Sequence, residues 1–288
     1  MVVGAGKTGI DTVLWLLERG VAPERLTWIR PRDPWLLNRL NVQPTPPFAQ
    51  RTLGAMVAEM EAAAQADSLD VLFSRLEAAE CLLRIDPAVA PTFFRCAIVS
   101  PAELQQLRRV GQVVRLGRVR AIERHRIVLA HGEVPTAPDQ VHVHCATDGL
   151  PRGPSQPVFQ PGRIVPQYLR RCSPSFGAAL TAWIESHFDS DAQKNALCEP
   201  VPPPREPLDW LRMHLATARN QQRWQAHADL QLWLRQSRLE AYSSLFAACS
   251  QQAEPAWMAL LQRLQHARAP ALRRMEALLR HAEAPSAH

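Results

Sequence analysis

A glycine motif directly after a short apolar segment constrains this chain more than any other feature. Residues 1–9 read Met-Val-Val-Gly-Ala-Gly-Lys-Thr-Gly, which is typical of the end of a buried strand followed by Gly-x-Gly-x-x-Gly. Gly4 allows a tight turn out of the strand, Gly6 lets the backbone approach a pyrophosphate, and Gly9 lets the next helix pack closely on the sheet. The N-terminus of that helix offers unpaired N–H groups and the positive end of its dipole to phosphates.

The residues after the motif supply the context that a lone glycine pattern lacks. Apolar side chains recur at the spacing of one helical face: Ile10, Val13, Leu14 and Leu17. Gly20 stands where a helix C-cap belongs, and residues 26–29 (Leu-Thr-Trp-Ile) are typical of a second strand. The result is a βαβ unit of about 30 residues, the length that the motif requires. The sequence therefore predicts a dinucleotide-binding loop formed by Gly4, Ala5, Gly6, Lys7, Thr8 and Gly9.

The residues after the second strand indicate which dinucleotide is bound. An acidic residue there would bind a ribose 2′-hydroxyl, whereas this chain has Arg30 and Arg32, which suit a 2′-phosphate. Asp33 follows both arginines and is the weaker candidate. The pattern predicts NADPH rather than NADH; the alternative is that both arginines simply face solvent.

A phosphate-binding P-loop is the competing interpretation of the same residues. Gly6-Lys7-Thr8 copies the end of Gly-x-x-x-x-Gly-Lys-Thr, but the first glycine of that pattern would fall on Met1. Gly9 and the arginines have no role in a P-loop, so the dinucleotide loop is favoured.

Only three residues precede Gly4, although a first strand of this kind normally has five or six. Either the central strand is unusually short, or this sequence is the later portion of a longer protein.

Composition excludes several classes of function. Of the 288 residues, 47% are hydrophobic and 21% charged, which is ordinary for a globular protein. The net charge of +6 is scattered along the chain, and two tyrosines offer little base stacking, so no nucleic-acid surface is expected. The six cysteines form no Cys-x-x-Cys, which excludes an adjacent redox dithiol. No apolar run has membrane-spanning length and no signal peptide precedes the motif, so we expect a cytoplasmic protein without a membrane span.

After residue 33 the predicted secondary structure changes several times along the chain. A proline-punctuated connection (34–47) leads to a helical stretch (52–81), a strand (93–99) and a capping box at Ser100 that starts a short helix (103–109). Short β-type runs at 113–114, 119–122 and 126–129 predict an antiparallel meander. Residues 140–149 are a final strand that ends in Cys-Ala-Thr-Asp-Gly. His142 and His144 alternate there, but without further ligands nearby, so no metal site is expected.

This order of elements resembles the pyridine-nucleotide domain of two-dinucleotide flavoproteins. The strings Gly-Ala-Gly-Lys-Thr-Gly-Ile-Asp (4–11) and Trp-Ile-Arg-Pro-Arg-Asp-Pro-Trp-Leu-Leu-Asn-Arg (28–39) are similar to a bacterial group of FAD/NAD(P)-dependent oxidoreductases related to flavin-containing monooxygenases. The resemblance covers most of the chain and is strongest over residues 1–40. In this family the last strand runs into an Ala-Thr-Gly-like turn; Asp148 is an extra residue between Thr147 and Gly149 here.

The resemblance implies two cofactors, of which this chain carries the site for one. Family members bind FAD at an N-terminal glycine motif and NADPH at a second motif well inside the chain. The arginines make the single motif here the second one, so the FAD site lies largely outside this chain. At most, Thr147, Gly149 and the segment to about residue 185 would complete an FAD domain.

The remaining chain divides at a proline-rich linker over residues 199–207. Residues 151–200 are interpreted as the returning part of an FAD-type domain, with a free-standing hairpin and helix as the alternative. Residues 201–288 are a helical region with helices predicted at 209–218, 230–248 and 257–281, the last broken by Pro270. Its tryptophans are expected in the core.

The sequence thus predicts an α/β fold with a Rossmann-type NAD(P)-binding domain (1–150) that carries inserted helices and a β-meander. The predicted function is the NADPH-binding portion of a flavin-dependent oxidoreductase, monooxygenase-like, that passes hydride from NADPH to FAD and acts on a small-molecule substrate. Two alternatives stay open: a flavin-independent NAD(P)-binding dehydrogenase, and a non-catalytic nucleotide-binding or interaction module. The sequence identifies no catalytic residue, substrate or oligomeric state.

Overall fold

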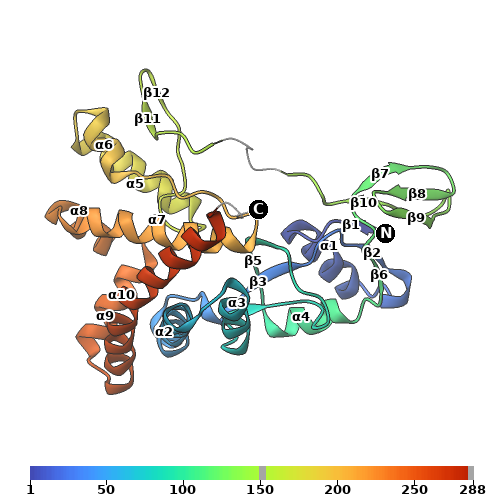
Figure 1. The fold of residues 1–288 in the computed structure, drawn as a ribbon, viewed down its shortest axis with the longest axis horizontal. Helices are drawn as coiled ribbons and strands as arrows, with labels where there is room; N and C mark the ends of the chain where they lie inside the picture. The colour runs from blue at the N-terminus through green and yellow to red at the C-terminus, as the bar shows by residue number, and fades with distance from the viewer. Residues whose placement is uncertain (149–153, 285–288) are drawn as a thin grey trace. The chain divides into compact units, whose positions relative to one another are not determined.

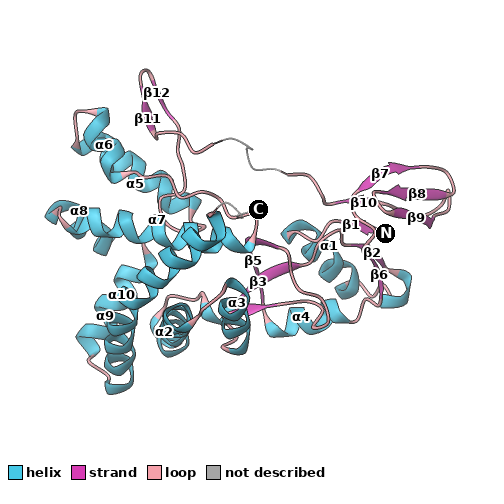
Figure 2. Ribbon diagram, in the orientation of Figure 1, coloured by secondary structure: helices cyan, strands magenta, loops and turns pink. Residues whose placement is uncertain are grey.

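The computed structural model describes residues 1–148 and 154–284, and the chain divides into two compact units. The sheet unit comprises Met1–Arg39 and Leu82–Arg152, and the helical unit comprises Leu40–Cys81 and Gly153–His288. Figure 1 follows the chain through both units, and Figure 2 shows that most strands belong to the sheet unit. The domain division expected from the sequence, 1–150, 151–200 and 201–288, stays a prediction.

The centre of the sheet unit is a parallel sheet of four short strands in the order β10-β1-β2-β6. Their bounds are Val2–Val3 for β1, Thr27–Ile29 for β2, Gln112–Val114 for β6 and Val143–His144 for β10. All three strand pairs are parallel, so the carboxyl ends of the four strands meet at one edge. The protein is therefore a mixed α/β chain, as predicted.

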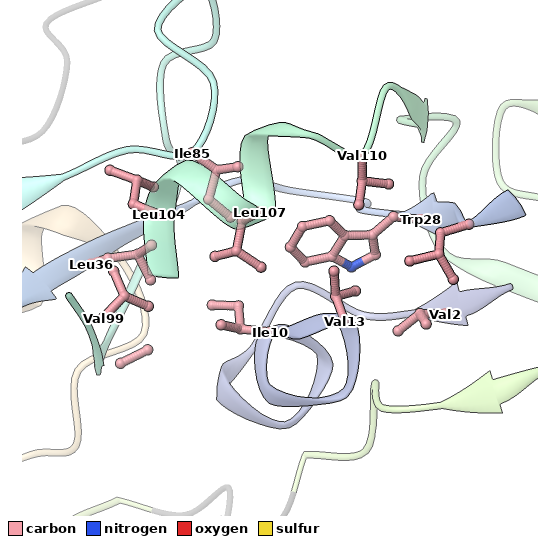
Figure 3. Packing of buried hydrophobic residues seen from close by; sticks show 12 residues of the cluster. Val2, Ile10, Val13, Trp28, Leu36, Ile85, Val99, Leu104, Leu107 and Val110 are labelled. Carbon is pink, nitrogen blue, oxygen red and sulfur yellow. The ribbon is translucent and has the colours of Figure 1, made fainter. Parts of the chain in front are cut away.

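Alternation along the strands gives the sheet two buried faces. Val2 and Trp28 pack into a core with side chains from α1 (Lys7–Glu18) and α4 (Pro101–Arg108). Figure 3 shows Val13 of α1 and Leu107 of α4 beside the Trp28 indole, with Ile10 of α1 close by and Leu104 of α4 farther along the same core. Each of these side chains is at most 5% exposed, and burial of such a side chain contributes about 1.5–3 kcal/mol.

The opposite face is covered by an antiparallel meander. Val3 and Ile29 pack there against Ile127 and Leu129 of the meander. Its strands are β7 (Val119–Ile122), β8 (Arg126–Leu129) and β9 (Gly132–Pro135), in that order. The predicted runs 119–122 and 126–129 are confirmed. The assignment of 113–114 to the meander is wrong, since these residues belong to β6 and pair in parallel with β2.

A second sheet of the same unit has the order β4-β3-β5. The predicted strand at 93–99 is confirmed as β5 (Phe93–Val99), while β4 covers Leu82–Leu83. β3 (Pro34–Asn38) lies in the stretch predicted as a connection, because Trp35 and Leu36 are buried and draw it into the sheet. Pro34 is tolerated at the first position of the strand.

The predicted capping box at Ser100 is confirmed at the start of α4. The Ser100 hydroxyl accepts a hydrogen bond from the Glu103 N–H (3.1 Å), and the Glu103 carboxylate accepts one from the Ser100 N–H (2.5 Å). The helix begins at Pro101, two residues earlier than predicted.

The helical unit combines a central part of the chain with its C-terminal half. From the central part come α2 (Ala49–Gln65) and α3 (Leu69–Ala78), together with two short 3-10 turns, Arg39–Asn41 at the unit boundary and Pro46–Phe48. A 3-10 turn of the sheet unit covers Pro23–Arg25. The C-terminal half contributes the hairpin β11 (Phe159–Gln160) and β12 (Arg163–Ile164), followed by α5 (Pro174–His187), α6 (Asp191–Leu197), α7 (Pro207–Gln225), α8 (Ala228–Gln236), α9 (Ala241–Gln252) and α10 (Pro255–Glu283).

Two features of these helices differ from the prediction. The helix expected at 230–248 is divided into α8 and α9 by a break at Ser237–Glu240. The expected break at Pro270 is absent, because α10 continues through it. Beyond the proline, Ala271, Met275 and Leu278 are buried, so packing outweighs the lost backbone hydrogen bond.

Of the four tryptophans expected in the core of the helical unit, Trp210 and Trp224 are buried, whereas Trp233 and Trp257 are partly buried against core clusters. Trp210 and Trp224 of α7 are 1% and 2% exposed, and the Trp224 indole N–H donates to the Leu197 carbonyl (2.8 Å). Over the described residues, no helix combines the length and apolar character needed to cross a membrane.

Candidate functional site

The three motif glycines are under different constraints. Gly4 has a φ of +120°, and a Cβ there would lie 2.5 Å from the Cys145 carbonyl oxygen of β10's end. A Cβ at Gly9 would lie 2.2 Å from the Gly4 carbonyl oxygen. A Cβ at Gly6 would meet no atom within 4 Å. Gly4 and Gly9 are thus required by the fold, whereas the space over Gly6 is open.

Hydrogen bonds from the neighbouring strands hold the loop in place. The Gly4 N–H donates to the Ile29 carbonyl (2.9 Å), and the buried Trp28 indole N–H donates to the Gly4 carbonyl (2.8 Å). On the other side, the Cys145 N–H donates to the Val3 carbonyl (2.8 Å). The loop backbone is therefore fixed by β2 and β10 before any ligand binds.

The N-terminus of α1 offers donors beside this open space. Gly6 is the N-cap and has no side chain to satisfy the first N–H groups of the helix. Lys7 and Thr8 are exposed in the first turn, and the Lys7 ammonium pairs with Asp11 one turn later. The backbone N–H groups and the helix dipole, rather than the Lys7 charge, are what this end presents to an anion.

Arg30 differs from the expectation that it is presented to a ligand. It is 2% exposed and lies over the Trp28 ring, with its guanidinium carbon 4.8 Å from the ring centroid. Its Nη1 is 3.1 Å from Asp33 Oδ1, an ion pair whose side chains are 3% and 1% exposed. Burial lowers the pKa of Arg30, and Asp33 opposes this shift. Arg30 would have to leave this buried pair to hold a phosphate.

Two residues that the sequence argument missed join this ion pair. Arg115 donates from Nε to Asp33 (2.7 Å) and from Nη2 to Asp86 (2.8 Å). Burial lowers the pKa of Arg115, but the bond to Asp33 and the charges of Asp33 and Asp86 outweigh it, so the pKa is raised. Arg115 directly follows β6, as Arg30 follows β2, which places both at the same sheet edge. The signal was hidden because 113–114 were assigned to the meander.

Buried polar atoms in this cluster lack a full set of partners. Arg30 Nε and Nη1 and Asp33 Oδ1 form no hydrogen bond within the part of the chain that the structure describes. The contact between Nη1 and Oδ1 is close enough for an ion pair, but it lacks hydrogen-bond geometry. The cluster therefore has hydrogen-bond donors and an acceptor at the sheet edge that are not used within the described residues.

Arg32 is the arginine that stays at the surface. Its residue is exposed, and its guanidinium carbon lies 5.3 Å from the centroid of the Phe93 ring. The cation–π contact helps to orient the guanidinium group. Of the two predicted phosphate ligands, Arg32 is the accessible one.

The last predicted residues follow β10. Thr147 is exposed in the segment after the strand, beside the edge where Gly4 meets Cys145. Asp148, the residue that departs from the family pattern, pairs with Arg95 at 3.1 Å. Gly149 lies outside the described residues.

Comparisons with known proteins give relatives without an assigned function. Over 250 residues the chain is 46% identical to uncharacterized proteins of Mycobacterium bovis and of two strains of Mycobacterium tuberculosis. The match covers 87% of this chain and 47% of each relative, so the chain spans about half the length of the curated relatives it matches. No protein-family model matches the chain, and no solved structure shows a significant match.

Proposed function

We propose that the sheet unit binds a pyridine dinucleotide, with NADPH preferred over NADH. The observation that carries this proposal is the open space over Gly6, which lies between two glycines that the fold packs tightly. Three glycines of equal structural value would indicate only a tight turn. One glycine without a structural reason, at the N-terminus of a helix, favours a loop kept bare for a phosphate.

The strand order supports a Rossmann-type arrangement. From one edge the order is β6-β2-β1-β10, which matches the 3-2-1-4 order of that fold when the strands are numbered along the chain. Along the chain, β2 and β6 are added on one side of β1, and β10 is added on the other side. Ligands of open α/β sheets bind at such a switch point. The glycine loop follows β1 and Thr147 follows β10, the two strands that flank this point.

In this proposal the backbone holds the pyrophosphate. The bare N–H groups of the first turn of α1 and the helix dipole would stabilise its negative charge over Gly6. Lys7 is paired with Asp11, so it would contribute less than the backbone.

The preference for NADPH rests on the charges after β2. Arg32 is exposed at this edge, whereas the charges of Arg30 and Arg115 are balanced by Asp33 and Asp86. Asp33 is buried and already pairs with two arginines, so it does not offer its carboxylate to a ribose hydroxyl.

We further propose that the chain is the NADPH-binding portion of a flavin-dependent, monooxygenase-like oxidoreductase. The family resemblance and the greater length of the mycobacterial relatives support this. The chain has one glycine motif, which the proposal gives to NADPH, and its described residues do not form a second loop that would fit FAD. We therefore derive no step through FAD from these residues; Thr147 and Gly149 are proposed only to adjoin its domain.

Gly6→Ala tests the nucleotide site directly. A methyl group at residue 6 enters open space and the backbone there has an ordinary φ of −75°, so folding should be unaffected. The same methyl group would block the pyrophosphate, and we expect NADPH to bind at least about tenfold more weakly, measured by titration calorimetry. Gly54→Ala, which also adds a methyl group to open space but on α2, is the matched control.

Three further measurements on the wild type and on variants separate the alternatives. Equal NADPH binding by wild type and Gly6→Ala would contradict the site. If Arg32→Gln leaves the ratio of NADPH to NADH affinity unchanged, Arg32 does not bind the 2′-phosphate. A flavin absorbance spectrum would show that these residues do hold FAD, and substrate turnover without flavin would favour the dehydrogenase.

A further inference from the structure

A cavity of about 390 Å³ lies within the helical unit and belongs to no site described above. It is lined by α2, α7, α9 and α10 together with the segment before α5. These helices are labelled in Figure 1, and α10 packs against each of the other three. The volume is in the range of sites for small organic molecules.

The wall of the cavity is largely apolar. Its side chains include Met60 of α2, Phe246 of α9, and Leu261, Leu264 and Leu272 of α10. All five line the cavity and are only partly buried. An occupant with an apolar body would bury apolar surface of this wall, which favours its binding.

Two arginines at the cavity already have carboxylate partners. Arg170 pairs with Glu240, and the side chains are 7% and 2% exposed. Arg171 pairs with Glu59, and its Nη2 donates to His214 Nε2 at 3.0 Å. The His214 ring packs against Trp210 at a tilt of 30°, and burial followed by the charge of Arg171 lowers the pKa of His214 well below its usual value. His214 is therefore neutral and adds no charge.

A third arginine is not neutralised in this way. Arg268 donates from Nη2 to the Gln221 side-chain carbonyl at 2.9 Å. Within residues 1–148 and 154–284, no carboxylate lies within ion-pair distance of its guanidinium group. Burial lowers the pKa of Arg268, which reflects the cost of holding its charge away from water.

The charged groups of the cavity therefore do not cancel. Arg170, Arg171 and Arg268 face two carboxylates, Glu59 and Glu240, which leaves a single positive charge. A planar guanidinium beside an apolar wall suits a carboxylate, because it can donate two parallel N–H bonds to the two oxygens.

We propose that this cavity binds a small organic monocarboxylate with an apolar body, and that Arg268 holds the carboxylate. The proposal goes beyond the nucleotide site, because every lining residue belongs to the helical unit and none belongs to the glycine loop. The apolar part of the wall favours a ligand with an apolar body over an inorganic anion, and the single positive charge favours an anionic ligand over a neutral one.

The test uses 4-phenylbutyrate as the carboxylate and 4-phenylbutyramide as its neutral counterpart, titrated into the purified chain by calorimetry. We expect the carboxylate to bind at least about tenfold more tightly than the amide. Arg268→Gln keeps a polar side chain of similar reach but removes the charge, and it should erase this difference. Arg263→Gln is the matched control, since Arg263 lies on the same helix in an exposed pair with Glu61.

A second variant tests the location without removing charge. Leu264→Trp fills the cavity from α10 and should abolish binding of both compounds. Circular dichroism and NADPH titration of each variant show whether the chain is folded and whether the sheet unit is intact. Absence of carboxylate binding to the folded wild type, or equal binding by Arg268→Gln, would overturn the proposal, whatever the outcome for NADPH.

Discussion

The two units build their candidate sites from different materials. The glycine loop of the sheet unit is a backbone site. Its shape depends on the absence of side chains at Gly4 and Gly9, and the space over it depends on the absence of one at Gly6. The cavity of the helical unit is a side-chain site, assembled from helices far apart in the sequence. A backbone site restricts its positions to one residue type and can be recognised in a sequence. A side-chain site uses ordinary residues at ordinary spacings, and it becomes visible only in the fold.

If the loop is a backbone site, one methyl group in its packed part should have the largest effect. The Cβ of Gly9→Ala would lie 2.2 Å from the Gly4 carbonyl oxygen, and backbone cannot move aside easily. We expect a loss of about 4 kcal/mol or more in the free energy of unfolding, measured with urea. An unfolding midpoint equal to that of wild type would show that the loop is not packed as described.

The buried Arg30–Asp33 ion pair is a side-chain element within the sheet unit. Its variants test how much side-chain contacts contribute to the stability of that unit. Asp33→Asn leaves the buried Arg30 guanidinium without its carboxylate and should cost about 3 kcal/mol. Asp86→Asn removes the more exposed end of the same network and should cost less than about 1 kcal/mol. Equal effects of the two substitutions in urea unfolding would contradict the burial of the pair.

His214 makes the side-chain site sensitive to pH. Its pKa in the folded state is lowered below the ordinary 6.5, so the unfolded chain binds the proton more readily. Stability contributed by the neutral imidazole is therefore present above about pH 6.5 and is lost as the pH falls below it. Between about pH 7 and pH 5 the loss from this group should reach up to about 2 kcal/mol. His214→Gln should remove that part of the pH dependence, and an unchanged slope would show that His214 is not the group responsible.

The smallest effect concerns a glycine outside the loop. Gly54 lies inside α2, where a Cβ meets nothing within 4 Å. Gly54→Ala should raise the free energy of unfolding by about 0.5–1 kcal/mol, because glycine is a poor helix former. A loss of stability instead would mean that glycine at this position also has a structural role.

The sequence was most informative where local chemistry decides the structure. The βαβ start and the capping box at Ser100 depend on neighbouring residues, and both were predicted. Residues 113–114 could not be assigned correctly, because a short apolar run pairs with whichever strand lies beside it, and that is a long-range choice. The predicted helix break at Pro270 was wrong for a similar reason, since packing against distant residues keeps α10 continuous.

The candidate site divides along the same line. The glycine turn between β1 and α1 was predicted, whereas the burial of Arg30 and the network with Arg115 were not. Nothing in the string Arg-Pro-Arg-Asp shows which arginine will turn inward to Asp33 and which will stay outside. Arg268 and its cavity left no motif at all, because their helices are brought together only by folding.

The pairing of α2 with α10 has a consequence for how this protein is made on the ribosome. α2 ends at residue 65, while the helix that packs along it begins only at residue 255. During synthesis, the apolar surface of α2 therefore stays without α10 until residues 66–254 and the helix itself have emerged. Until then the growing chain presents that surface to chaperones or to other unfinished chains. Its yield in a cell will depend on protection during that interval as well as on the stability of the finished fold.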